Sequence, residues 1–132
     1  MKIYNLPHIL PHRFPPRTSA NPHGYDVCCN CGGPRLEHSI RCLECWFKYM
    51  SNRHFDTEEK SIELKDLIES QQYICPYTKN LLVPGENASI DHKIPLSRGG
   101  INDISNMHWV DVGANGKKQS KTHEEYLRII KL

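Results

Sequence analysis

The chain has 132 residues, of which 38% are hydrophobic and 24% charged, so its length suits one domain with a core of modest size. Seventeen Lys and Arg residues against fifteen Asp and Glu residues give a net charge of +2, which is compatible with nucleic acid but does not require it. The sequence lacks a run of about 18 apolar residues and a signal peptide at its start, so we expect a cytoplasmic protein with no membrane partner and with reduced cysteines.

The N-terminal segment, residues 1–25, is rich in proline. It holds five of the nine prolines of the chain, and proline has neither the backbone donor nor the backbone freedom that a regular helix requires. We therefore predict an extended N-terminal arm. Its apolar side chains favour packing along the body of the protein or along a partner, and Arg13 and Arg17 offer the alternative of contact with DNA.

Residues 26–55 are predicted to form a zinc-binding module, a small ribbon or knuckle. Two C-x-x-C pairs, Cys28 with Cys31 and Cys42 with Cys45, are separated by ten residues. Each pair places two thiolates on one tight turn, and two such turns supply the tetrahedral four-sulfur shell that structural Zn²⁺ prefers. Two disulfides are the alternative that the spacing leaves open.

The two remaining cysteines, Cys29 and Cys75, are interpreted as free thiols. The module that precedes residue 56 resembles the small zinc modules of phage and intron-encoded endonucleases, which often help to contact DNA. Its aromatic side chains favour packing beside the zinc site. Four cationic side chains of this module are predicted to contact DNA: Arg35, Arg41, Lys48 and Arg53.

A single linking helix is predicted over residues 56–72. Asp56 and Glu59 have the spacing of a capping box, and Leu64 and Ile68 lie on one face of the helix. The opposite face is strongly acidic. We therefore expect this helix to point away from DNA and to connect the zinc module with the remainder of the chain.

Residues 73–132 contain short apolar runs separated by turn residues. Two strands are predicted at residues 88–91 and 107–110, joined by a long loop, and a helix is predicted to begin near residues 112–114. A final helix follows a capping box. The side chains expected to pack in this part are Tyr77, Leu81, Leu82, Trp109, Tyr126, Ile129 and Ile130.

The stretch from Ile90 to Gly100 has the composition of a metal-dependent site that cleaves phosphodiester bonds. Asp91 stands beside His92 at the predicted end of a strand, and a proline and a glycine pair shape the loop that follows. A carboxylate binds a divalent cation, and a neutral histidine takes a proton from water near neutral pH. An isolated Asp-His pair is more often a surface turn, so the prediction depends on the motifs around it.

Those motifs are Asp-His-x-x-Pro, Gly-Gly, Asn-Met-x-x-Val and Asn-x-x-Lys. Together they make residues 73–125 resemble the HNH endonuclease family, also called His-Me finger or ββα-metal nucleases. The resemblance implies an α+β fold in which two strands and a helix form the catalytic unit. It also implies that His92 is the general base, that Asp91 and Asn115 bind one Mg²⁺ or Mn²⁺ ion, and that Asn106 orients the His92 ring through a hydrogen bond.

The expected function is therefore that of a DNA endonuclease with one catalytic Mg²⁺-type ion and one structural Zn²⁺. A site-specific homing-type or phage enzyme that cuts double-stranded DNA fits the resemblance best. The alternatives are a type II restriction endonuclease that acts as a homodimer and a non-catalytic, zinc-dependent DNA-binding module. Further DNA contacts are expected from Lys93, Arg98, Lys117, Lys118 and Lys121.

The chain departs from many members of that family at two places around the predicted site. They carry two C-x-x-C pairs there, whereas residues 75–78 keep one cysteine and residues 111–114 keep none. We therefore expect no zinc at these positions, and apolar packing must hold the catalytic unit together. His108 is left without a role, and His123 is only a second choice as a metal ligand.

Overall fold

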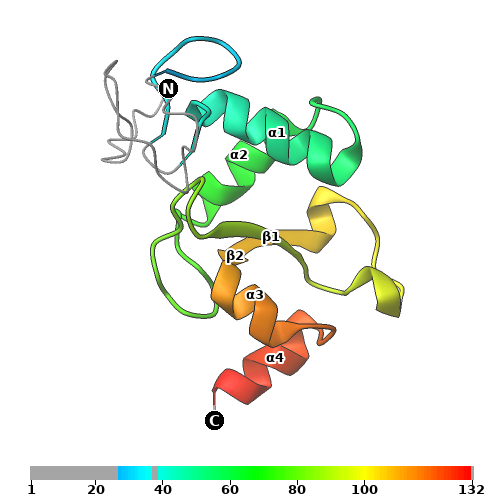
Figure 1. The fold of residues 1–132 in the computed structure, drawn as a ribbon. Helices are drawn as coiled ribbons and strands as arrows, with labels where there is room; N and C mark the ends of the chain where they lie inside the picture. Colours follow the sequence, from blue (N-terminus) through cyan, green and yellow to red (C-terminus); the bar gives the residue numbers. More distant parts are fainter. Residues whose placement is uncertain (1–26, 37–38, 132) are drawn as a thin grey trace.

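The computed structural model describes residues 27–36 and 39–131, which form a small α+β unit with a two-stranded antiparallel sheet (Figure 1). The predicted arm at residues 1–25 lies outside the described residues. Along the described part of the chain the elements are α1 (Leu43–Phe55), α2 (Ser61–Ser70), β1 (Ala88–His92), two short 3-10 turns η1 (Leu96–Arg98) and η2 (Ile104–Asn106), β2 (Met107–Asp111), α3 (Val112–Lys118) and α4 (His123–Ile130).

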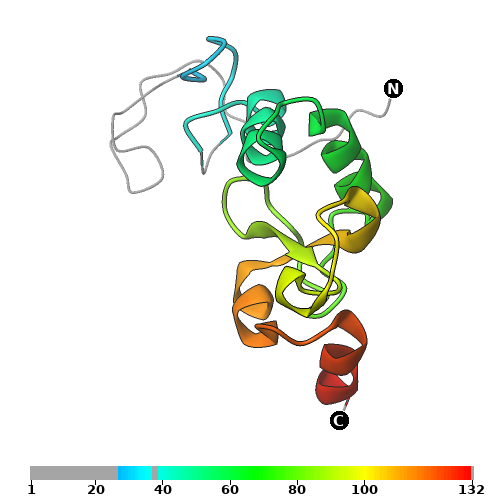
Figure 2. The same cartoon turned by 90° about the vertical axis from the view of Figure 1, so that its right-hand side faces the viewer.

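The sheet lies between two pairs of helices (Figures 1 and 2). Helices α1 and α2 pack against each other on one side of the hairpin, α3 follows β2 directly and packs against both strands, and α4 lies beyond α3 at the C-terminal end. Among the described helices, none combines the length and the apolar character that crossing a membrane requires.

Helix α1 begins at the second C-x-x-C pair and ends at Phe55. The linking helix was predicted to begin at the next residue, Asp56. The sulfur of Cys42 caps the first turn of α1 by accepting a hydrogen bond from the backbone N–H of Cys45. Asp56 ends α1 in a left-handed conformation, with φ of 59°. Because a left-handed residue stops a helix, the predicted start at Asp56 is wrong, and α2 begins at Ser61 instead.

Three aromatic rings join the helices to the sheet. Trp46 and Phe47 of α1 pack against Trp109 of β2, with ring centroids 5.3 and 5.9 Å apart respectively. The side chain of Gln71, just after α2, donates to the carbonyl of Trp109 at 2.7 Å and accepts from its N–H at 2.8 Å. This clamp fixes the position of β2 against α2.

One apolar core runs through all of these elements, from the cysteine loop to the last helix. It confirms the predicted burial of Tyr77, Leu82 and Trp109, whereas Leu81 is 55% exposed and was predicted wrongly. The buried members of the core are Leu36, Trp46, Phe47, Met50, Leu64, Ile68, Tyr73, Cys75, Tyr77, Leu82, Ile90, Met107, Trp109, Val110, Ala114 and Tyr126.

The predicted hairpin is present, and its register brings Asp91 opposite His108. The loop between the strands is closed by a tight approach of two segments. Gly100 lies so near Ile94 that a Cβ atom at this position would stand 1.8 Å from the Ile94 carbonyl oxygen. Only glycine fits there, which explains the second residue of the glycine pair.

Helix α4 confirms its predicted capping box and corrects its predicted apolar stripe. The Thr122 hydroxyl accepts from the N–H of Glu125, and the Glu125 carboxylate accepts from the N–H of Thr122. Tyr126 is buried, but Ile129 and Ile130 are 49% and 40% exposed. The helix therefore docks through Tyr126 and through Leu127, which also packs against the core, rather than along its whole length.

Candidate functional site

Asp91 is a buried carboxylate held by two side chains from other elements. Its Oδ2 accepts a hydrogen bond from Nε2 of His108 at 2.7 Å, across the hairpin. Its Oδ1 accepts from Nζ of Lys118 at 3.2 Å, and Lys118 also donates to the carbonyl of His92 at 3.0 Å. Since the Lys118 side chain is fully buried, the ion pair between Lys118 and Asp91 is a fixed part of the structure.

A buried chain of polar groups continues from His108 toward α4. The Tyr77 hydroxyl lies 3.3 Å from Nε2 of His108 and 2.7 Å from Nδ1 of His123. Burial raises the pKa of Tyr77, so its hydroxyl keeps the proton and donates it in a hydrogen bond to His123. Burial also lowers the pKa of His123, which leaves its ring neutral and able to accept. These hydrogen bonds give Tyr77, His108 and His123 a shared structural role.

His92 is oriented by Asn102, a residue that the motifs did not identify. Nε2 of His92 lies 2.9 Å from Oδ1 of Asn102, and Nδ2 of Asn102 donates to the backbone carbonyl of His54 at 2.8 Å. A carbonyl only accepts hydrogen bonds, so the amide nitrogen of Asn102 must face His54 and its oxygen must face His92. The proton of a neutral His92 ring is therefore on Nε2, and its lone pair is on Nδ1.

Asn106 does not orient the His92 ring as predicted. Its Oδ1 accepts from the N–H of Ile94 at 3.0 Å, and its Nδ2 donates to the carbonyls of Ile94 and Ile101 at 2.9 Å each. These three bonds use the amide to tie the start of the loop to its end. Asn106 therefore fixes the loop that follows His92, while the His92 ring bonds to Asn102 instead.

Asp91, His92 and Asn115 line one hollow of about 270 Å³ at the end of the hairpin. Nδ2 of Asn115 donates to the Ser89 hydroxyl and to the Ile90 carbonyl, both at 3.3 Å. Its amide oxygen has no hydrogen-bond partner among the residues that the structure describes. The hollow thus combines an imidazole with a carboxylate and an amide oxygen.

These two oxygen-bearing groups suit a hard divalent cation such as Mg²⁺ or Mn²⁺. Each oxygen of Asp91 uses one lone pair on a protein donor, and a carboxylate has about four acceptor positions in all. Asp91 and Asn115 would therefore be able to hold such an ion while the contacts of His108 and Lys118 remain.

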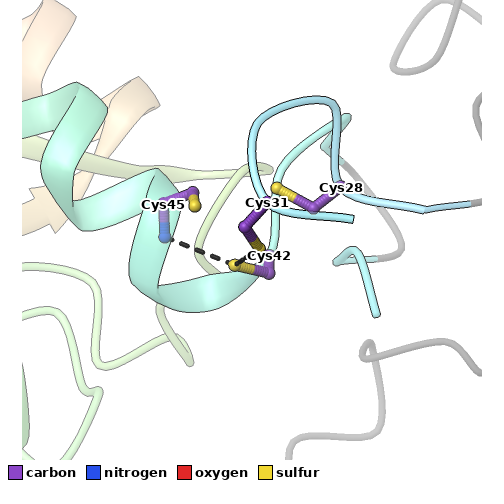
Figure 3. A group of neighbouring side chains, drawn as sticks. All are labelled: Cys28, Cys31, Cys42 and Cys45. Carbon is purple, nitrogen blue, oxygen red and sulfur yellow. Dashed lines mark hydrogen bonds between the residues drawn. The ribbon is translucent and has the colours of Figure 1, made fainter. Parts of the chain in front are cut away.

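The four predicted cysteines meet at the start of α1 (Figure 3). The sulfur atoms of Cys28, Cys31, Cys42 and Cys45 all lie within 4.8 Å of one another, and those of Cys31 and Cys42 are 3.6 Å apart. Four sulfurs around a zinc ion at about 2.3 Å would be about 3.8 Å apart, so the cluster has the dimensions of a metal site. None of these cysteines forms a disulfide.

The thiols of the cluster differ in how readily they lose their protons. Burial tends to raise the pKa of Cys28, but hydrogen bonds from the backbone of Cys31, Cys42 and Asn30 outweigh it and bring that pKa to about 6. Burial raises the pKa of Cys42 and of Cys45. The Cys28 thiolate thus forms readily, whereas Cys42 and Cys45 need a positive charge nearby before they lose their protons.

No family model matches the chain, and a comparison with curated proteins gives no match either. The function is therefore inferred from the motifs and from the arrangement of the side chains. The arrangement divides the cations predicted to contact DNA into buried side chains, one surface side chain in an ion pair, and other side chains at or near the surface.

Two of the predicted DNA contacts are corrected, because their side chains are buried. Arg35 is 3% exposed and donates to the carbonyls of Leu36 and Ser39, so it supports the cysteine loop. Lys118 is occupied by Asp91. A third, Arg98, is on the surface but forms an ion pair with Glu125.

The other predicted cations lie at or near the surface, in different places. Arg41 stacks on Tyr49 with its guanidinium carbon 4.1 Å from the ring centroid, and Arg53 lies one helical turn further along α1. Lys48 is on another face of α1, beside α2. The remaining three are Lys93 in the loop after β1, Lys117 near the end of α3, and Lys121 before α4.

Proposed function

We propose that the chain is a metal-dependent DNA endonuclease of the HNH type, which hydrolyses phosphodiester bonds. The observation that carries this proposal is that Asp91 and His92 of β1 and Asn115 of α3, the helix that follows the hairpin, line the same hollow. A base together with a carboxylate and an amide oxygen that can hold a divalent ion suits the metal-assisted hydrolysis of a phosphodiester. The family motifs in the sequence support the same function.

In this mechanism His92 is the general base. Its Nδ1 lone pair takes a proton from the attacking water, while Nε2–H remains bonded to Asn102. Asp91 and Asn115 would hold the divalent ion, which would supply positive charge to stabilise the transition state and the leaving oxygen. Asn106 keeps the loop that begins after His92 in place. The four-cysteine cluster is assigned a structural Zn²⁺, since four sulfur ligands leave no open position for substrate.

The buried Lys118 sets a limit on how tightly the divalent ion is bound. Its ammonium group cancels the charge of the Asp91 carboxylate before any ion arrives. The remaining ligand, Asn115, is neutral. Because little net negative charge is available, the proposed ion is exchangeable and is removed by EDTA.

The proposal is tested by nicking of a supercoiled plasmid. The wild-type protein with Mg²⁺ or Mn²⁺ is expected to convert the plasmid to open-circular or linear DNA, and EDTA is expected to stop the conversion. A His92→Ala preparation purified in parallel excludes a contaminating nuclease. Binding to double-stranded DNA with no cutting under any divalent metal would contradict the proposal and favour the non-catalytic DNA-binding module.

The proposed substrate is double-stranded DNA cut at a specific site, as by a homing-type or phage enzyme. One hollow of this kind cuts one strand, so a double-strand cut at a palindromic site would take two copies related by a two-fold axis. Sequencing of the cut ends, together with a solution mass measurement, distinguishes a nicking monomer from a homodimer of the restriction type.

Substitution of Asn102 tests the tautomer assigned to His92. Asn102→Ala is expected to lower kcat by roughly 10- to 100-fold with KM for DNA unchanged, the range typical for partners that orient functional histidines. ¹⁵N NMR of the His92 ring should show a mixture of tautomers in this variant and a proton on Nε2 in the wild type.

Asn102→Asp is the matched control, because its carboxylate still accepts from Nε2–H although it no longer donates to His54. It should keep the wild-type tautomer and recover part of the rate. An Asn102→Ala protein with wild-type kcat and an unchanged ring spectrum would contradict a positioning role.

A further inference from the structure

A second hollow adjoins the one that holds Asp91 and His92. It measures about 380 Å³ and lies between α1 on one side and β1 with α3 on the other. Ile90 and Asn115 line both hollows, so the two hollows adjoin at these residues. We call the hollow beside α1 the α1 groove; on the α1 side it is lined by Tyr49, Arg53 and His54.

The α1 groove carries positive charge that no described carboxylate neutralises through an ion pair. Arg53 lines the groove, and one of its guanidinium nitrogens lies 3.4 Å from the Tyr49 hydroxyl. Arg41 is not a lining residue, but its guanidinium stacks on the ring of Tyr49, which is one. Neither arginine forms an ion pair within the described residues. Burial and the charge of Arg53 lower the pKa of His54, so the positive charge beside the groove comes from Arg41 and Arg53. Glu86 is the one acidic residue lining the groove.

The helix itself determines which cations of α1 face this groove. Tyr49 and Arg53 are four residues apart and therefore lie on the same face. Lys48 is five residues from Arg53, which places it about 140° away around the helix. It lines a different hollow with Glu44, Ile62 and Lys65 of the α1–α2 surface.

We propose that the α1 groove guides one strand of the nucleic acid into the hollow of Asp91 and His92, with Arg53 and Arg41 contacting phosphates next to the scissile one. This inference rests on the proposed endonuclease function and adds the direction from which the substrate arrives. Guanidinium groups suit phosphate because they donate two parallel hydrogen bonds, and Arg41 is held in place by the ring beneath it. The strand then passes Asn115, which borders both hollows, and avoids the surface that carries Lys48.

The test measures how the full-length protein binds a fluorescent DNA duplex at several salt concentrations, in a His92→Ala background that prevents cutting. Arg53→Gln is expected to weaken binding several-fold and to lower the slope of log K against log salt by about one, the effect of losing one phosphate contact. Lys48→Gln, on the same helix, is expected to leave the slope unchanged. Arg53→Lys, which keeps the charge, should restore most of the slope.

Equal effects of Arg53→Gln and Lys48→Gln, or a larger effect of Lys48→Gln, would overturn the inference, and so would an unchanged slope in Arg53→Gln. Both variants change exposed side chains, and their thermal unfolding should match that of the parent protein. Failure of the proposed function has a different signature. In that case the wild type nicks no plasmid, whatever the two α1 variants do to binding.

Discussion

His92→Ala is expected to lower the rate of plasmid cutting by about 10²- to 10⁴-fold, the usual contribution of a general base. The ring is replaced by a methyl group, so no side chain at this position can take the proton from water. The loss should appear in the rate constant of the cutting step, measured under single-turnover conditions with saturating protein. The affinity for DNA should stay that of the wild type. Asp91 and Asn115 are unchanged, so the requirement for a divalent ion should also persist in any residual activity.

The stability of the fold should be almost unaffected, because His92 is only half-buried and its ring hydrogen bond lies at the surface. Thermal unfolding of the variant therefore serves as the control. A His92→Ala protein that cuts DNA at close to the wild-type rate would remove His92 as the base. A protein that has lost DNA binding together with cutting would indicate a role in binding rather than in chemistry.

Cys42→Ser is expected to have the largest effect on stability. Cys42 contributes a sulfur to the four-cysteine cluster and also caps the first turn of α1. A serine oxygen is a poor replacement in a four-sulfur zinc shell, and losing a structural metal is among the few single changes that cost about 4 kcal/mol or more. For a domain of this size, that cost lowers the midpoint of thermal unfolding by on the order of 10 °C or more.

The neighbouring Cys29 provides a matched control, since it is exposed and lies outside the cluster. Cys29→Ser should change the stability by less than about 0.5 kcal/mol. Elemental analysis is expected to find about one zinc per chain in the wild type and in Cys29→Ser, and little in Cys42→Ser. Because the thiols must lose protons to bind the metal, acidification should release zinc. Full zinc content in Cys42→Ser, or disulfides found by mass spectrometry in the wild type, would contradict the assignment.

Local patterns in the sequence predicted those parts of the structure that depend on neighbouring residues. The spacing of the cysteines anticipated the cluster, because each C-x-x-C pair closes its own turn. The short apolar runs around Ile90 and Trp109 anticipated the two strands, and Thr122 with Glu125 anticipated the start of α4. The predicted start of a helix at Asp56 was wrong, because a capping-box spacing does not reveal that this residue ends the preceding helix in a left-handed conformation.

The sequence by itself determined the candidate chemistry of this protein: four thiols at metal spacing, and an acid, a histidine and an amide that suit hydrolysis. Only the tertiary structure decided which partners these groups have. Asn102 reaches His92 and the carbonyl of His54, which is 48 residues away from it, while Lys118 turns inward to Asp91 instead of outward to DNA. No periodic pattern records such contacts, because they depend on how helices and loops distant in sequence pack against one another.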